Sequence, residues 1–413
     1  MTARRGGVQL AVRPPCHDVP VKRKKPSPPR SIEIFAGGGG MALGLHQAGF
    51  EHSALVEWDS QACDTLRNNA SGRWALDGIW DGDVRDWLDG PSPASVGEID
   101  LVAGGPPCQP FSLGGVHAGE NDERNMFPAA LDTVRQFTPK AVMFENVPGL
   151  MRTSFRPYFD YVVNQLREPS VNIKKGELWY EHAARVIKKP RGTRSLRYRV
   201  MDPVILNSAD YGIPQTRRRV FIVAIRDDLG VEWSGLPETH SKVSLNYDQW
   251  VEETYWEDHR LPVPPAEMTA KAILKLKIAG RPETDRWRTV RDMLREPTPL
   301  PKPVDGVSPR GVANHIGIPG ARSYTGHTGS YIDLPSKTMK AGVHGVCGGE
   351  AMIRFEDDSL RYLTVREAAR VQGFPDDYGF EGARGTAMHQ IGNAVAVGVA
   401  RQVGERLRSI LSI

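Results

Sequence analysis

The residues best suited to chemistry are a single cysteine and the prolines around it. Cys108 stands in the stretch Gly104–Ser112, GGPPCQPFS. Pro106, Pro107 and Pro110 fix their own φ angles and lack a backbone N–H, which excludes a helix interior and predicts a rigid, extended turn. A cysteine beside such a turn is either a small structural residue or a thiol whose position has to be fixed. Residues elsewhere in the chain decide between the two.

Glycines and acidic residues at the ends of predicted strands suit a nucleoside-like ligand. The stretch FAGGGG (35–40) lies between a predicted strand and a predicted helix, where backbone N–H groups can approach a ligand. Glu57 ends the next strand, about 20 residues further on, and is placed to bind the two hydroxyls of a ribose. Trp58 could stack on an adenine, and Asp83, after the third strand, could accept from its amino group. These residues predict an adenosine-containing cofactor, with ordinary helix-capping carboxylates as the alternative.

The elements that must position these residues alternate between strands and helices. Strand-like runs occur at 32–35, 52–60, 82–87, 99–105, 141–147 and 218–226, and helical runs occupy 41–49 and 62–69. Strands that alternate with helices predict a doubly wound α/β fold with a mostly parallel sheet. In such a fold ligands bind at the carboxyl ends of the strands, where the glycines, Glu57 and Asp83 stand.

The chain divides into parts of different composition. The predicted divisions are a basic, disordered tail (1–30), a first domain (31–228), a smaller second domain (229–324) and a C-terminal part (325–413). The second domain is rich in proline, tryptophan, glutamate and arginine, and little regular structure is predicted there. Two amphipathic helical runs, 362–375 and 389–411, are apolar enough to pack back on the first domain.

The composition is that of a globular protein, because 40% of the residues are apolar and 25% are charged. At 413 residues the chain is long enough for two or three domains. No run approaches the roughly 18 apolar residues of a membrane span, and the N-terminus has no apolar signal core, so we expect a cytoplasmic protein. The four cysteines are scattered without a CxxC pair, so we expect no metal site and no disulfide framework.

A basic stretch interrupts the first domain. Residues 172–199 carry nine lysines and arginines against two glutamates, although the net charge of the whole chain is only +4. Such a run is usually a solvated face. The interleaved Trp179, Tyr180 and Tyr198 also suit a surface that contacts phosphates, so both interpretations stay open.

Eight short motifs connect these features to a known family. In chain order the motifs are FAGGGG, EWD, GDVRD, GGPPCQPFS, ENVPGL, QTRRR, REAARVQGFP and QIGNAV. With them the sequence resembles the DNA cytosine-5 methyltransferases from Ser31 to about Leu411, outside the basic stretch and the second domain. The resemblance implies a Rossmann-like catalytic and cofactor-binding domain, S-adenosyl-L-methionine as cofactor, double-stranded DNA as partner and a target-recognition domain at 229–324.

The resemblance also implies catalytic roles for four residues. Cys108 is implied as the nucleophile, because C5 of cytosine is reactive enough to take a methyl group only after a thiolate adds at C6. Addition at C6 moves electrons to N3, where Glu145 would donate a proton while accepting from the 4-amino group. In QTRRR, Arg219 would contact the cytosine O2 and Arg217 would support the pocket, whereas Arg218 alternates to the other face.

A further set of positions is implied to bind the cofactor. It consists of Phe35, Gly37, Gly39, Glu57, Trp58, Asp83, Val84, Pro106, Asn393 and Val395. The sequence departs from the family pattern in two places. Ala396 follows QIGNAV where relatives usually have proline, and the loop after Cys108 contains Gly114 and Gly115, which leaves Ser112 as the candidate to fill the space of a flipped base.

The implied activity is sequence-specific methylation of C5 of a cytosine flipped out of duplex DNA. We expect the protein to act on DNA as a monomer and to protect host DNA from a cognate restriction endonuclease. The Arg-, Ala-, Gly- and Pro-rich composition suggests a GC-rich genome, and a GC-rich palindrome such as GCCGGC is the expected target. Two alternatives stay open: the tRNA-methylating branch of the family, whose Cys-Phe-Thr signature is absent here, and a catalytically silent DNA-binding paralogue.

Overall fold

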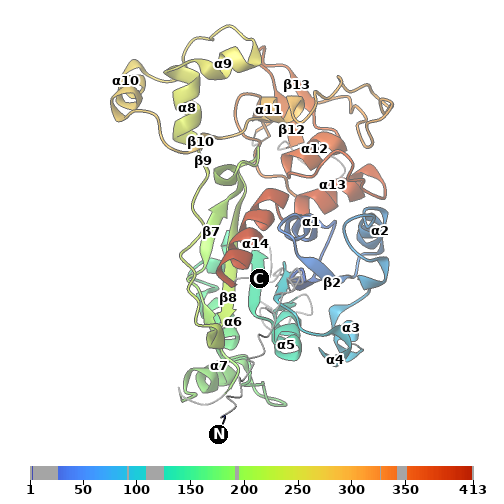
Figure 1. Cartoon of the computed structure of the whole chain (residues 1–413). Helices are drawn as coiled ribbons and strands as arrows, with labels where there is room; N and C mark the ends of the chain where they lie inside the picture. Colours follow the sequence, from blue (N-terminus) through green and yellow to red (C-terminus); the bar gives the residue numbers. More distant parts are fainter. Residues whose placement is uncertain are drawn as a thin grey trace.

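The computed structural model describes residues 27–90, 93–107, 125–190, 195–325, 327–341 and 351–411, together with Thr2. Most of the basic tail, and the segment 108–124 with Cys108 and Ser112, lie outside the described residues. The described part of the chain holds a central sheet, helices on both of its faces and a lobe above it that contains α8 to α11 (Figure 1).

The central sheet has eight strands in the order β3-β2-β1-β4-β5-β8-β6, with β7 paired to β8. The strands are β1 (Arg30–Ile34), β2 (Glu51–Glu57), β3 (Ile79–Asp81), β4 (Leu101–Gly104), β5 (Ala141–Asn146), β6 (Tyr198–Val200), β7 (Val204–Asn207) and β8 (Arg218–Arg226). β1 to β5 pair in parallel, whereas β8 runs antiparallel to β5, β6 and β7. The chain moves outward from β1 through β2 to β3, then continues through β4 and β5 on the other side of β1, so the predicted doubly wound, mostly parallel α/β fold is confirmed.

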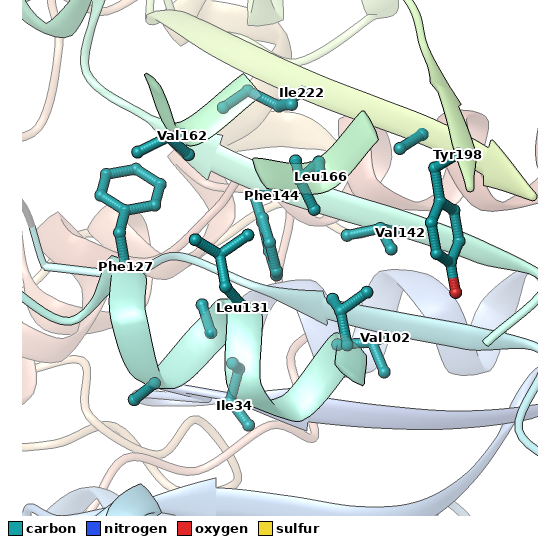
Figure 2. Close-up of a cluster of buried hydrophobic side chains, with 14 of the residues drawn as sticks. Ile34, Val102, Phe127, Leu131, Val142, Phe144, Val162, Leu166, Tyr198 and Ile222 are labelled. Carbon is teal, nitrogen blue, oxygen red and sulfur yellow. The ribbon is translucent and has the colours of Figure 1, made fainter. Parts of the chain in front are cut away.

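Helices cover both faces of this sheet. One face packs against α3 (Val84–Asp89), α5 (Phe127–Phe137) and α6 (Arg156–Arg167), and the other packs against α1 (Gly40–Gln47) and α14 (Val397–Leu411). Figure 2 shows the first of these cores, in which side chains of α5 and α6 surround Val142 and Phe144 of β5. The sheet is therefore the middle layer of three, and its central strands, such as β4 and β5, are buried on both sides.

Burial on both sides explains why the strands read as continuous apolar runs. All residues of β5 are buried, including Glu145 and Asn146 at its carboxyl end. Parallel strands between two helical layers need such runs. A buried glutamate and asparagine at the end of an otherwise apolar strand mark the edge where a polar site lies.

Glycines allow α14 to pack closely on α1, as Figure 1 shows for the two helices. A Cβ built on Gly44 would lie 2.5 Å from the carbonyl oxygen of Val397, and one built on Gly40 would lie 2.4 Å from that of Val395. Both distances are shorter than any van der Waals contact, so a larger residue would force the helices apart. The C-terminal part is thereby fixed against the start of the first helix.

The second region contains more regular structure than its composition predicts. Between residues 229 and 324, all described, lie α8 (Lys242–Trp250), α9 (Thr254–His259), α10 (Ala270–Ala279), α11 (Val290–Arg295), β9 (His240–Ser241) and β10 (Asp285–Arg286). The expectation of little regular structure here was wrong. Three of the helices begin at a capping hydroxyl, that of Ser241, Thr269 or Thr289. Short capped helices carry little periodic signal, so the proline-rich composition concealed them.

The remaining elements are α2 (Ser60–Asn68), α4 (Pro93–Val96), α7 (Trp179–Ile187), α12 (Val365–Val371), α13 (Arg384–Asn393), β11 (Ser330–Tyr331), β12 (Met352–Arg354) and β13 (Leu360–Tyr362), with short 3-10 turns between some of them. Within the described residues, no helix combines the length and apolarity that crossing a membrane would require.

Two element predictions need correction. Residues 82–87 were predicted as a strand, but β3 ends at Asp81 and α3 begins at Val84. The single helix predicted at 389–411 is two helices, α13 and α14. Ala394 interrupts the helix with a ψ of 142°, and Nε2 of Gln372 donates there to the carbonyl oxygens of Ile391 at 2.6 Å and Ala394 at 3.3 Å.

Candidate active site

One edge of the sheet gathers most of the residues predicted for the site. β1, β2, β4 and β5 end at this edge, and β8, which is antiparallel to β5, begins there. Gly37, Glu57, Pro106 and Glu145 end or follow those four strands, and Arg219 is the second residue of β8. Because doubly wound folds bind ligands at the carboxyl ends of their strands, this edge is the candidate active site.

Glu57 clamps the glycine turn that follows β1. Its Oε2 accepts from the backbone N–H of Gly37 at 2.7 Å, and its Oε1 accepts from those of Trp58 at 3.0 Å and Asp59 at 2.9 Å. Burial raises the pKa of Glu57, and these three N–H groups partly oppose the rise. Since each carboxylate oxygen has two lone pairs, the clamp leaves acceptor capacity for a ligand hydroxyl.

The surroundings of the glycine turn fit an adenosine-containing cofactor. Gly37 has a φ of +53°, and no described atom lies within 4 Å of a Cβ built on it. Trp58 is 79% exposed, so its indole is accessible to a ligand. Phe35 has a φ of 58°, a conformation that costs a bulky residue free energy and that clusters at functional sites. Gly39 is different, because a Cβ there would lie 2.3 Å from Oη of Tyr378, so packing explains that glycine.

The two predicted residues after β3 are engaged with the protein itself. Asp83 caps α3 by accepting from the backbone N–H of Arg85 at 2.7 Å, and the Arg85 guanidinium also binds both of its carboxylate oxygens. The Arg85 side chain holds the pKa of Asp83 below its usual value. The side chain of Val84 is buried in the core, so its backbone N–H, in the first turn of α3, is the group that a ligand could bind. The structure thus shows the capping role for Asp83.

Of the two C-terminal positions, Val395 contacts the glycine turn. Its carbonyl oxygen stands 2.4 Å from the place of a Cβ on Gly40. Asn393 is the last residue of α13 and is exposed, and its Nδ2 lies 3.3 Å from Nε2 of His389. A contact between Asn393 and a cofactor stays a prediction.

The strongest candidate for chemistry is Glu145, at the end of β5. The residue is 7% exposed, and its Oε1 lies 3.0 Å from Nε of Arg219. The two groups form an ion pair, yet among the described residues no donor is directed at Oε1, which is a buried acceptor without a hydrogen bond. Burial raises the pKa of Glu145, and Arg219 and Arg217 partly oppose the rise. A buried carboxyl of this kind can keep a proton closer to neutral pH and can bond to a ligand.

Arg217 ties the start of β8 to the C-terminal part of the chain. Its Nη1 donates to the carbonyl oxygen of Met339 and its Nη2 to that of Gly392, both at 2.9 Å. Burial lowers the pKa of Arg217 to about 9, helped by repulsion from Arg219, and the side chain stays protonated at neutral pH. These contacts fit a supporting role rather than direct contact with a substrate. Arg218 is exposed.

Asn146 is a site residue that the sequence reasoning missed. Its Nδ2 donates to the carbonyl oxygen of Pro106 at 2.9 Å, which fixes the residues that lead to Cys108. A Cβ built on Gly105 would lie 3.5 Å from Oε2 of Glu145, so the same stretch runs past the catalytic candidate. The sequence does contain a signal for Asn146. This residue follows Glu145 directly in the motif ENV, at the end of a predicted strand, and its side-chain amide can donate a hydrogen bond. Cys108 itself lies outside the described residues.

The basic stretch 172–199 lies at the opposite edge of the sheet. It contains α7, and its last residues form β6, which pairs with the final residues of β8. Figure 1 shows α7 at the bottom of the molecule and the second region at the top. Arg185 pairs with Glu177 at 2.6 Å, and Nζ of Lys189 lies 3.2 Å from Glu168. The placement of the basic stretch, far from the second region, favours a solvated face with some ion pairs over a surface that contacts phosphates.

Replacing Lys188 and Lys189 with alanine should therefore leave DNA binding and its salt dependence unchanged. Each lost phosphate contact would make the slope of log K against log salt shallower by about 0.9. Anisotropy titrations with labelled duplex at several salt concentrations measure that slope. Arg218→Ala, an exposed residue at the candidate edge, is the comparison that we expect to reduce the slope. A shallower slope for the lysine variant would restore the phosphate-contact interpretation.

Solved structures with the same fold come from methyltransferases. A DNA modification methyltransferase encoded within an E. coli prophage aligns over 93% of this chain and 100% of its own, with a TM-score of 0.53 and 22% identity. The S. pombe Dnmt2 methyltransferase aligns over 93% and 99%, with a TM-score of 0.54 and 15% identity. At these identities the likeness shows the fold alone, which is the Rossmann-like fold of such methyltransferases.

Sequence comparisons identify the family. The family model for C-5 cytosine-specific DNA methylases matches residues 30–409. The type II methyltransferase M.NgoMIV of Neisseria gonorrhoeae is 31% identical over 386 residues, which span 91% of this chain and 96% of that protein. M.Eco47II of Escherichia coli is 30% identical over 385 residues, with 92% and 79% covered. Both of these relatives are type II methyltransferases, which favours the DNA-methylating branch over the tRNA-methylating one. The chain therefore belongs to the C-5 cytosine-specific DNA methylases and is a DNA (cytosine-5)-methyltransferase of the type II restriction–modification class.

Proposed function

We propose that this enzyme methylates C5 of a cytosine flipped out of duplex DNA, through a covalent bond between Cys108 and C6 of the base. The observation that carries the proposal is the buried Glu145 carboxyl, whose Oε1 accepts no hydrogen bond from the described residues although it lies 3.0 Å from Nε of Arg219. The edge of a cytosine offers N3, the 4-amino group and O2, which match a carboxyl and a guanidinium side by side. Their presence argues against a silent paralogue.

The ring has to be activated before it receives the methyl group. S-adenosyl-L-methionine, the donor that the family implies, supplies an electrophilic methyl group on a sulfonium. The Cys108 thiolate adds to C6, and the electron pair of the 5,6 double bond moves through the ring toward N3 and O2. C5 would become nucleophilic and would bond to the methyl carbon as the bond between that carbon and the sulfonium sulfur breaks, with the electron pair staying on the sulfur. Loss of the C5 proton to a base then expels the thiolate and restores the ring.

Glu145 and Arg219 would stabilise the negative charge that this addition creates on the ring. Because burial raises the pKa of Glu145, the carboxyl can hold a proton and donate it to N3 while its other oxygen accepts from the 4-amino group. Arg219 would stabilise the charge on O2 through a guanidinium already fixed at the pocket. Arg217 and Asn146 act through other groups, since Arg217 anchors β8 and Asn146 holds the residues before Cys108.

The residues that would hold the cofactor lie on the other half of the same edge. Glu57 would accept from a ribose hydroxyl with the lone pair that its three backbone contacts leave on Oε2, and Trp58 would stack on the adenine. Gly37 leaves room for close approach of the ligand to the backbone. The proposed set is completed by Phe35, Gly39, Val84, Pro106, Asn393 and Val395. Asp83 would have to share its carboxylate with Arg85.

The base has to leave the helix for these groups to reach it. C6 must be approached from the face of the ring, and N3 takes part in base pairing, so both are blocked inside a stacked duplex. We propose that the region 229–324 recognises the target and that Ser112 fills the space of the extruded base. A GC-rich palindrome such as GCCGGC stays our prediction for the target. Protection of host DNA in the cytoplasm from a cognate endonuclease, with a monomer acting on DNA, completes the proposal.

Bisulfite sequencing of DNA from cells that express the protein tests this function. We expect conversion-resistant cytosines at one position of one short motif, and none in cells that express Cys108→Ala. Complete conversion in both, with wild-type protein present in the cells, would contradict the proposed activity. The motif obtained would also decide the prediction of GCCGGC.

A further inference from the structure

A short segment, residues 330–339, joins the second region to the candidate active site, and we name it the connector. At one end, Oδ1 of Asp333 accepts from Oη of Tyr255 at 2.7 Å and from Nε of Arg291 at 2.6 Å, and its Oδ2 accepts from Nη2 of Arg291 at 3.0 Å. The Asp333 carbonyl oxygen accepts from Nε2 of Gln249 at 2.9 Å. One residue of the connector therefore binds side chains from α8, α9 and α11 at once.

The other end of the connector is bonded to the residues at the start of β8. The backbone N–H of Thr216 donates to the carbonyl oxygen of Ser336 at 2.8 Å. The backbone N–H of Met339 donates to Oε1 of Gln215 at 2.8 Å, and its carbonyl oxygen accepts from Nη1 of Arg217 at 2.9 Å. Two residues after Arg217 comes the arginine that pairs with Glu145.

The bonds at the β8 end are shielded from water, and those at the other end are partly buried, with the side chains of Asp333 and Arg291 19% and 13% exposed. Ser336 and Gln215 have no exposed surface, Arg217 is 2% exposed, and Tyr255 is fully buried. Buried polar contacts cannot be exchanged for water at low cost, and packed interiors pass displacements on rather than absorb them. A change in the placement of α8, α9 and α11 is therefore expected to reach the pocket of Glu145 and Arg219 through the connector.

We propose that Asp333 is a positioning residue that couples the placement of the second region on DNA to the geometry of the base pocket. The proposal rests on the proposed function, in which the region 229–324 recognises the target. Correct placement of the second region on the target sequence would fix the position of the connector. The connector would in turn fix the position of the residues at the start of β8. Asp333 is a suitable coupling point because its charge is matched by Arg291 and its contacts involve three helices.

Asp333→Asn tests the coupling. The asparagine amide keeps an oxygen that can accept from Tyr255. It lacks the negative charge of the carboxylate, however, and would turn its N–H groups toward Arg291. We expect the single-turnover rate on the target motif to fall by roughly 10- to 100-fold, because small displacements of reacting groups have effects of that size. We also expect the ratio of methylation at the target to methylation at motifs with one changed base to fall. A residue that only stabilises the fold would lower the amount of active enzyme and leave that ratio unchanged.

Two further variants make the result decisive. Asp358→Asn removes a carboxylate from the exposed pair with Arg354, outside the connector, and should change neither quantity. Tyr255→Phe deletes the hydroxyl that binds Asp333, should lower the ratio by a smaller factor, and gives the answer if circular dichroism shows Asp333→Asn to be unfolded. If the ratio of methylation at the target to methylation at altered motifs is unchanged in the folded variants, the coupling is overturned. Methylation by the wild type would still support the proposed function in that case. Absence of methylation by the wild type would instead contradict the proposed function itself.

Discussion

Replacing Cys108 with alanine should reduce methyl transfer by at least about a thousand-fold while leaving the affinity for S-adenosyl-L-methionine nearly unchanged. Without a thiolate, C5 is never activated, and only binding and orientation contribute to the rate. The residues that we propose for the cofactor, Glu57, Trp58 and Gly37, lie on the other half of the edge, so their contacts should persist. Incorporation of labelled methyl groups and calorimetric titration of the cofactor measure the two quantities.

A second cysteine provides the matched control. Cys63 is buried in α2, its Sγ donates to the carbonyl oxygen of Glu57 at 3.3 Å, and burial raises its pKa to about 12. It is a thiol rather than a thiolate at neutral pH and cannot act as a nucleophile. Cys63→Ala should retain activity within a few-fold. Activity of Cys108→Ala within tenfold of the wild type would remove Cys108 from the mechanism.

Glu145→Gln should lower the single-turnover rate by roughly 10²- to 10⁴-fold, the range that positioned proton donors contribute. The amide keeps the shape of the side chain but cannot transfer a proton to N3. Because burial raises the pKa of Glu145, the protonated form extends to higher pH than for an ordinary glutamate and is lost as the pH rises through that pKa. The wild-type rate should therefore fall on the alkaline side, and the variant should lack this decline.

Glu168→Gln is the control for loss of a buried carboxylate. Glu168 is also buried and paired, with Arg197 at 2.7 Å, but it lies beside the basic stretch at the opposite edge of the sheet. This variant should keep the wild-type rate and pH profile. An alkaline decline that persists in Glu145→Gln would mean that another group titrates, and Glu145 would lose its assigned role.

The central strands could be predicted from the sequence because burial on both faces leaves long apolar runs. β5 and β8 are of this kind. β3 has only three residues, one of them half-buried and the others exposed, so the pattern placed the strand a few residues too late, in α3. The helices of the second region escaped prediction because they are short and depend on local caps and on contacts such as those of Asp333.

The residue types at the strand ends were enough to locate the candidate site. Glu57, Glu145 and Arg219 lie on one edge because the sheet topology places them there. What sequence reasoning could not supply is which groups each side chain bonds. The pairing of Asp83 with Arg85 is a local contact between residues two positions apart. The bonds of Arg217 to the carbonyl oxygens of Met339 and Gly392, by contrast, depend on long-range geometry that no local pattern encodes. Asn146 was overlooked for the same reason, since its partner Pro106 lies on the neighbouring strand end.

Trapping with 5-fluorocytosine tests covalent catalysis on the base most directly. A duplex with this base at the target position can accept the Cys108 thiolate and the methyl group, but fluorine cannot leave C5 as a cation, so the enzyme stays bound. With S-adenosyl-L-methionine present, a denaturing gel should show a band at the combined mass of protein and DNA, and Cys108→Ala should show none. Absence of the band for a wild-type enzyme that methylates ordinary DNA would contradict the covalent mechanism.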